Sequence, residues 1–112
     1  MELITWKDFE KVHLLVGTIV DVQDFPEARK PAYRLRIDLG EALGVKTSSA
    51  QITELYSKED LVGKQVIVVA NFPKKQIGPL MSEVLVTGFP REDGKIVLAT
   101  TDMECPRGTR LV

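Results

Sequence analysis

Short stretches rich in Val, Ile and Leu, separated by glycines and prolines, recur along the chain and constrain its fold more than any other feature. The clearest is "YRLRIDLG", residues 33–40, in which apolar and polar side chains alternate strictly. A period of two places the apolar side chains on one face of a β-strand and the polar ones on the other. The apolar face must be buried against another layer, so the sequence predicts a small sheet or barrel.

Other stretches of the chain are interpreted as strands for the same reason. Gly17 lies inside the first of them and indicates a bulge or tight bend. Residues 73–81 hold two prolines and a glycine, which predicts a loop, and Asp93-Gly94 predicts a turn between the last two strands. The tail from Glu104 is expected to be extended. The predicted strands span residues 14–24, 33–40, 44–53, 64–72, 82–89 and 95–101.

Two short helices complete the predicted order of elements. Thr5 is expected to cap a helix over residues 6–12, with Trp6 and Phe9 on one face. Residues 53–63 are interpreted as a short helical connection between the third and fourth strands. This is the plan of an all-β, five-stranded OB-fold barrel formed by a single domain, residues 1–112. SH3-like and split barrels fit the pattern almost as well.

The net charge and the counts of certain residues limit the functions that this chain can have. The net charge of −1 means that any nucleic-acid binding must come from a local basic patch. Cys105 and His13 are the only residues of their types, so we expect no disulfide, metal site or cofactor. No catalytic constellation is recognised, which indicates a binding protein rather than an enzyme. No apolar run is long enough to cross a membrane and the N-terminus lacks the apolar centre of a signal peptide, so we expect a cytoplasmic location without membrane insertion.

Two basic clusters are candidates for phosphate binding. Arg29, Lys30, Arg34 and Arg36 fall within eight residues, and the last two share the outward face of one strand. Lys74 and Lys75 follow Phe72, a combination that suits a nucleotide whose base stacks while its phosphate is neutralised. For both clusters, solvated surface charge is the alternative reading.

A polar segment, "GVKTSSAQIT" at residues 44–53, lies between strand-like stretches. If it is the third strand, Lys46, Ser48 and Gln51 lie on or beside the face that OB-folds use for oligonucleotides. A polar edge strand that resists aggregation is the alternative.

The sequence also resembles the CsaA family of export-related chaperones, within the broader group of tRNA-binding OB domains. The stretches that carry the resemblance are "VGTIVDVQDFPEARKPAYRLRIDLG", "GVKTSSAQITELY", "LVGKQVIVVANFP", "SEVLVTG" and "PRGTRLV". "SSAQIT" before a Tyr and "NFP" after the apolar strand are the specific signals, and they point to the chaperone branch.

The resemblance implies several partners. These are tRNA, unfolded or pre-secretory polypeptide, the export machinery and a second copy of the chain. An accessory module of the aminoacyl-tRNA synthetase type, without chaperone activity, is the alternative. By position, the implied homodimer interface includes Trp6, Phe9, Pro106 and Leu111. The implied tRNA-binding residues are Lys30, Arg34, Arg36, Ser48, Ser49, Gln51, Asn71, Lys74, Lys75, Ser82 and Glu83.

Overall fold

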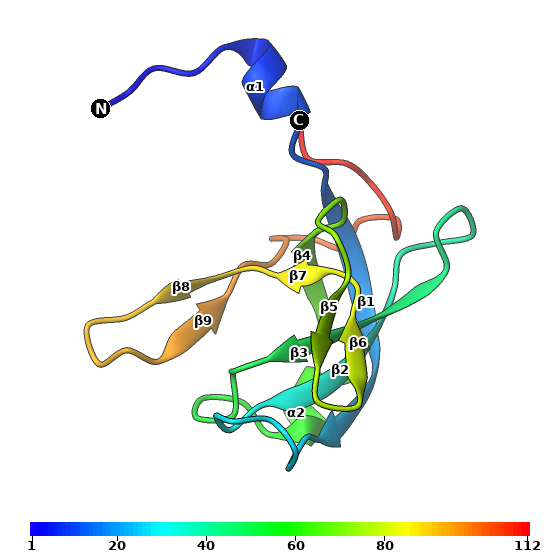
Figure 1. Cartoon of the computed structure of the whole chain (residues 1–112). Coiled ribbons are helices and arrows are strands. Elements are labelled where there is room, and N and C mark those ends of the chain that lie inside the picture. Colours follow the sequence, from blue (N-terminus) through cyan, green and yellow to red (C-terminus); the bar gives the residue numbers. More distant parts are fainter.

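The computed structural model describes all 112 residues and shows a mostly β structure with two short helices (Figure 1). Its main element is a five-stranded antiparallel sheet in the order β3-β2-β1-β4-β7, which curls into a nearly closed barrel. The predicted OB-type barrel is therefore confirmed. The strands of this sheet are β1 (Leu14–Asp24), β2 (Tyr33–Asp38), β3 (Val45–Ala50), β4 (Gln65–Val69) and β7 (Leu85–Val86).

The core fills the inside of this barrel. Ile19, Ile37, Val66 and Val68 are fully buried, and Leu35 is almost so. They come from β1, β2 and β4, and each buried side chain contributes about 1.5–3 kcal/mol through the hydrophobic effect. The core thus rests on the alternation that made β2 recognisable in the sequence.

Both helices begin with a capping box but are shorter than predicted. In α1 (Trp6–Glu10), Thr5 and Asp8 cap each other, and in α2 (Lys58–Leu61) Ser57 and Asp60 do the same. The α1 helix buries no side chain, whereas α2 buries Leu61 in the core. Residues 11–12, 53–57 and 62–63 lie outside the helices. Lys11 and Val12 still donate to the carbonyls of Asp8 and Phe9, so α1 ends in a turn with bonds three residues apart.

The predicted bulge at Gly17 is misplaced. Gly17 pairs regularly with Val66 of β4, and the register of β1 against β2 shifts between Ile19 and Asp21 instead. Gly17 is needed for another reason, since a Cβ atom there would overlap the side chains of Ile37 and Leu39. The missing side chain lets two strands pack closely.

Residues 73–81 form a hairpin rather than the predicted loop. The hairpin consists of β5 (Lys75–Ile77) and β6 (Leu80–Ser82), and it turns at Gly78, whose φ is +54°. Leu80 anchors the hairpin on the barrel by packing with Phe25 and Ala32 in a separate small cluster.

The predicted strand over residues 82–89 is divided into shorter pieces. After β7 the chain enters β8 (Gly88–Pro90), which pairs with β9 (Ile96–Leu98) in a hairpin that projects from the barrel (Figure 1). The turn predicted at Asp93-Gly94 is confirmed, with Gly94 N–H donating to the Arg91 carbonyl.

The C-terminal tail forms no helix, as predicted, and turns at residues 107–108. Its last residues run along the beginning of β1, which the sequence did not predict. Gly108 N–H donates to the carbonyl of Val16 (2.7 Å), and Leu111 N–H donates to that of Leu14 (2.8 Å). The side chain of Gln65 holds the tail by bonding both the N–H and the carbonyl of Cys105. No helix is long and apolar enough to span a bilayer.

Candidate nucleic-acid interface

The register of β2 against β3 determines which polar side chains face outward. Arg34 lies opposite Ser49 and Arg36 opposite Thr47, and residues opposite each other in a sheet share a face. Ser48 instead faces the core, where it is 1% exposed and its hydroxyl donates to the Val84 carbonyl (2.8 Å). The structure therefore places Ser48 out of reach of a ligand, contrary to its predicted role, and leaves Ser49 on the surface.

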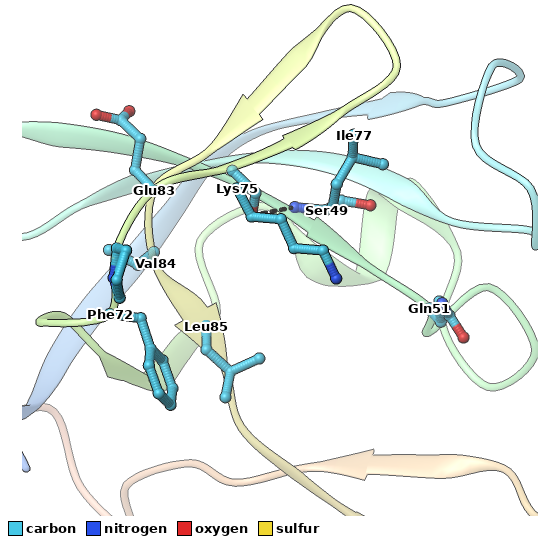
Figure 2. Close-up of a pocket in the computed structure, with 10 residues that line it drawn as sticks. Ser49, Gln51, Phe72, Lys75, Ile77, Glu83, Val84 and Leu85 are labelled. Carbon is cyan, nitrogen blue, oxygen red and sulfur yellow. Dashed lines mark hydrogen bonds between the residues drawn. The ribbon is translucent and has the colours of Figure 1, made fainter.

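Ser49 and Gln51 line three adjoining hollows, which together we call the groove. The first hollow, shown in Figure 2, is also lined by Phe72, Lys75 and Leu85. The second hollow lies between the end of β3 and the strands β7 to β9, and its walls are mostly apolar. The third hollow lies between the loop over residues 27–32 and the β5–β6 hairpin. Polar, basic and apolar groups are thus brought to one continuous surface.

Three cations of the groove have no anionic partner. Arg29 and Lys30 come from the loop after β1 and Lys75 from β5, and all three line the third hollow. None of them takes part in an ion pair, although six pairs form elsewhere. Glu27 also lines this hollow but pairs with none of the three cations, so the cations outnumber the carboxylate there. Like charges held around one hollow repel each other, and a bound phosphate relieves that repulsion.

Lys74 differs from its neighbour Lys75. Its ammonium lies 3.7 Å from the Glu83 carboxylate, and that of Lys46 lies 3.9 Å away from the same group. Glu83 also accepts hydrogen bonds from the N–H and the hydroxyl of Thr47, both at 3.1 Å. Burial by itself would raise the pKa of Glu83, but the bonds from Thr47 and the two ammonium groups outweigh it, and the pKa is lowered. Glu83 therefore fixes β3 to the end of the hairpin as a carboxylate.

The side chains of two more predicted tRNA-binding residues form hydrogen bonds within the protein. The Asn71 side chain accepts from His13 N–H (2.9 Å) and donates to the Lys11 carbonyl (2.7 Å), which ties the end of β4 to the segment before β1. The Ser82 hydroxyl accepts from Ser49 N–H (3.4 Å) and lines the first hollow. Asn71 lines none of the three hollows.

The arginines of β2 lie apart from the groove. Arg34 and Arg36 line a separate hollow with Thr47 and Leu80, and the guanidinium of Arg34 sits 5.5 Å from the centre of the Phe25 ring. Leu80 belongs to β6, whereas Lys75 of β5 lines the groove, so the β5–β6 hairpin separates the two surfaces. Arg34 and Arg36 therefore share the sheet face of Ser49 but line a different hollow on it.

The predicted dimer contacts lie at the opposite end from the hairpin turn. Trp6 is 67% exposed and packs against Phe9, with ring centroids 5.3 Å apart. Pro106 and Leu111 are exposed on the tail, which Arg110 joins to α1 through the Glu10 carbonyl.

Two residues could not be identified from the sequence: Leu85, which lines the groove, and Thr47, which lies outside it. Leu85 was assigned to a strand without an outward role, yet it lines both the first and the second hollow. Thr47 was not selected at all, although it holds Glu83. The roles of both residues follow from which strands pair with theirs. That pairing cannot be determined from the sequence alone.

The fold and the groove together define a small OB-type barrel that carries a groove lined by polar, basic and apolar side chains. A family model described as "Putative tRNA binding domain" matches residues 14–110. The chain belongs to this family, and the resemblance predicted from the sequence is confirmed.

Solved structures match over the whole chain. The chaperone CsaA from Bacillus anthracis is 46% identical with a TM-score of 0.92, covering 99% of this chain and 100% of that one. CsaA from Picrophilus torridus is 47% identical with the same TM-score, covering 98% of this chain and 100% of that one. A protein related to methionyl-tRNA synthetase from Pyrococcus horikoshii is 28% identical with a TM-score of 0.87, and both chains are fully covered.

The curated relatives are much longer proteins, and this chain matches only a small part of each. The methionine–tRNA ligase of Thermococcus onnurineus is 35% identical over 112 residues, which is 99% of this chain and 15% of that enzyme. The chain therefore spans about one-seventh of the length of such enzymes, and the family model describes a binding domain rather than a catalytic one.

Proposed function

We propose that this protein binds tRNA through the groove, with Arg29, Lys30 and Lys75 neutralising phosphates. The observation that carries the proposal is the convergence of three unpaired cations on a hollow that Ser49 and Gln51 also line. Hydroxyl and amide groups hydrogen-bond base edges and the 2′-hydroxyl of RNA. Membership of the tRNA-binding family supports the choice of tRNA among nucleic acids.

We infer a second activity, in which the protein acts in the cytoplasm as a chaperone for unfolded or pre-secretory polypeptide and works with the export machinery. The full-length similarity to two CsaA chaperones supports this inference. The second hollow provides the apolar surface, since Ile52, Leu85, Val86, Ile96 and Leu98 line it. A tRNA-binding accessory module of the synthetase type, without chaperone activity, is the competing assignment, and the ligase matches support it.

A homodimer is part of this proposal. Ile4, Trp6 and Val112 expose 68%, 67% and 98% of their surface, and Leu111 exposes 43%. These residues lie in the arm before β1 and the tail beside it, where a second copy would cover them. Trp6, Phe9, Pro106 and Leu111 are accordingly our proposed contacts.

Sedimentation velocity during a tRNA titration tests both the RNA binding and the dimer. We expect a dimer that binds tRNA at low salt and loses affinity steeply as the salt concentration rises, because bound phosphates release counterions. A monomer would contradict the dimer, and no complex with tRNA at low salt would contradict the main proposal.

Light scattering from a denatured client protein tests the chaperone inference. A chemically unfolded client diluted into buffer should aggregate less when this protein is present in molar excess, because the apolar hollow covers exposed segments. Serum albumin at equal mass serves as the control for unspecific protection. Equal scattering in both samples would leave the accessory-module assignment in its place.

A further inference from the structure

We propose that the first hollow of the groove holds one unstacked nucleobase against Phe72, so that the protein prefers unpaired RNA to duplex. This inference rests on the proposed tRNA binding and adds the class of RNA that the groove selects. It concerns Phe72, Lys75, Ser49 and Gln51, whose side chains surround the hollow in Figure 2.

Phe72 provides a surface for stacking. It follows β4, its side chain is 55% exposed, and Leu85 lies beside it in the hollow. A second exposed aromatic residue, Phe89, is 66% exposed on the β8–β9 hairpin but lines none of the three hollows of the groove. Phe72 is therefore set apart by its place next to polar and basic groups rather than by exposure.

The polar side of the hollow fits the rest of a nucleotide. Figure 2 shows Lys75 extending across the hollow toward Gln51, and its ammonium has no carboxylate partner. The Gln51 amide both donates and accepts, and the Ser49 hydroxyl does the same. These groups can bind a phosphate and a base edge while the ring of Phe72 contacts the face of the base.

An apolar side chain from a polypeptide fits this hollow less well. It would cover Lys75, Ser49 and Gln51 without giving them partners, and burying unpaired polar groups is costly. A nucleotide supplies a partner to each of them. Glu83 also lines the first hollow, but its carboxylate is paired with Lys46 and Lys74, so the ammonium of Lys75 is the unpaired charge there. That cation favours RNA, whereas the second hollow has no charged side chain in its walls and suits polypeptide.

Duplex RNA cannot use Phe72 in this way. The faces of its bases are stacked on one another, so only phosphates and sugar hydroxyls remain for the groove. An unpaired base adds its stacking on the aromatic ring, which is expected to raise affinity about tenfold.

Titration of two fluorescent RNA probes tests the inference, one a single-stranded oligonucleotide and the other a hairpin duplex of equal length and charge. Phe72→Ala should weaken binding of the single strand about tenfold and binding of the duplex less than twofold. Phe89→Ala is the matched control and should change neither. In a Trp6→Phe background, the indole introduced by Phe72→Trp should be quenched by the single strand only.

Three outcomes would overturn the inference. The first is an equal loss of affinity for both probes with Phe72→Ala, and the second is no loss of affinity for either probe. In both cases the proposed function still stands, provided that the wild-type protein binds RNA. The third is a loss confined to denatured polypeptide, which would assign the hollow to an apolar side chain. If the wild-type protein binds neither probe nor tRNA at low salt, the proposed function itself fails.

Discussion

Replacing Lys30 and Lys75 together by alanine is expected to weaken tRNA binding by about 10- to 100-fold, or roughly 1.4–2.7 kcal/mol. Both ammonium groups line the third hollow and lack carboxylate partners, so each is free to bind phosphate. Two lost phosphate contacts should also reduce the slope of log affinity against log salt by about 1.5 to 2. Fluorescence anisotropy at several salt concentrations measures both quantities.

The matched control removes two other lysines and changes the net charge equally. Lys11→Ala with Lys58→Ala should reduce affinity less than threefold, since their ammonium groups pair with Asp8 and Asp24 and none of these residues lines the groove. Any effect of overall charge is common to the two variants. Equal losses in the two double variants would mean that the groove attracts RNA only by its general field and that the third hollow is not a phosphate site.

Gly108→Ala is expected to have the largest effect on stability outside the core, lowering the free energy of unfolding by about 3 kcal/mol. Gly108 has a φ of +86°, which is unfavourable for alanine, and its added Cβ would overlap the backbone carbonyl of Leu39. Leu39 is almost fully buried, so that carbonyl cannot move aside cheaply. Urea unfolding followed by circular dichroism measures the change.

Gly94→Ala separates the two causes. Gly94 has a similar φ of +80°, but nothing lies within 4 Å of the position of its Cβ. It should therefore cost only about 1 kcal/mol, the strain of the left-handed backbone alone. If both variants lose the same amount, the contact of the tail with Leu39 contributes nothing. Hydrogen exchange should further show that Gly108→Ala exposes the amide of Leu111, which bonds Leu14 in the wild type.

The fold was predictable where burial repeats locally. In residues 33–38 every second side chain enters the core, so the sequence reports directly on the strand. The β5–β6 hairpin was missed because its strands are three residues long, too short for a period to be visible, and because Gly78 and Pro79 resemble a loop. The sequence indicated a bulge at Gly17, but the glycine is needed for close packing against Ile37. That contact is distant in the sequence and could not be predicted from the local pattern.

The composition of the site was predictable, but its exact residues were not. Ser48 and Ser49 are identical neighbours, and only the pairing with β2 determines which of them faces the core. Lys74 and Lys75 show the same limit, because Glu83 lies near one of them and the groove near the other. Local sequence carries neither fact.

Because the tail runs beside β1, the barrel can be joined to other proteins in a particular way. The hydrogen bonds of Leu111 and Arg110 to Leu14 and Glu10 bring both chain ends to one pole (Figure 1). No residue before Glu27 or after Leu98 lines the groove. A fusion partner, tag or surface tether at either end would thus leave the groove open, which makes this barrel portable: grafted onto an unrelated enzyme, it should carry its ligand preference with it.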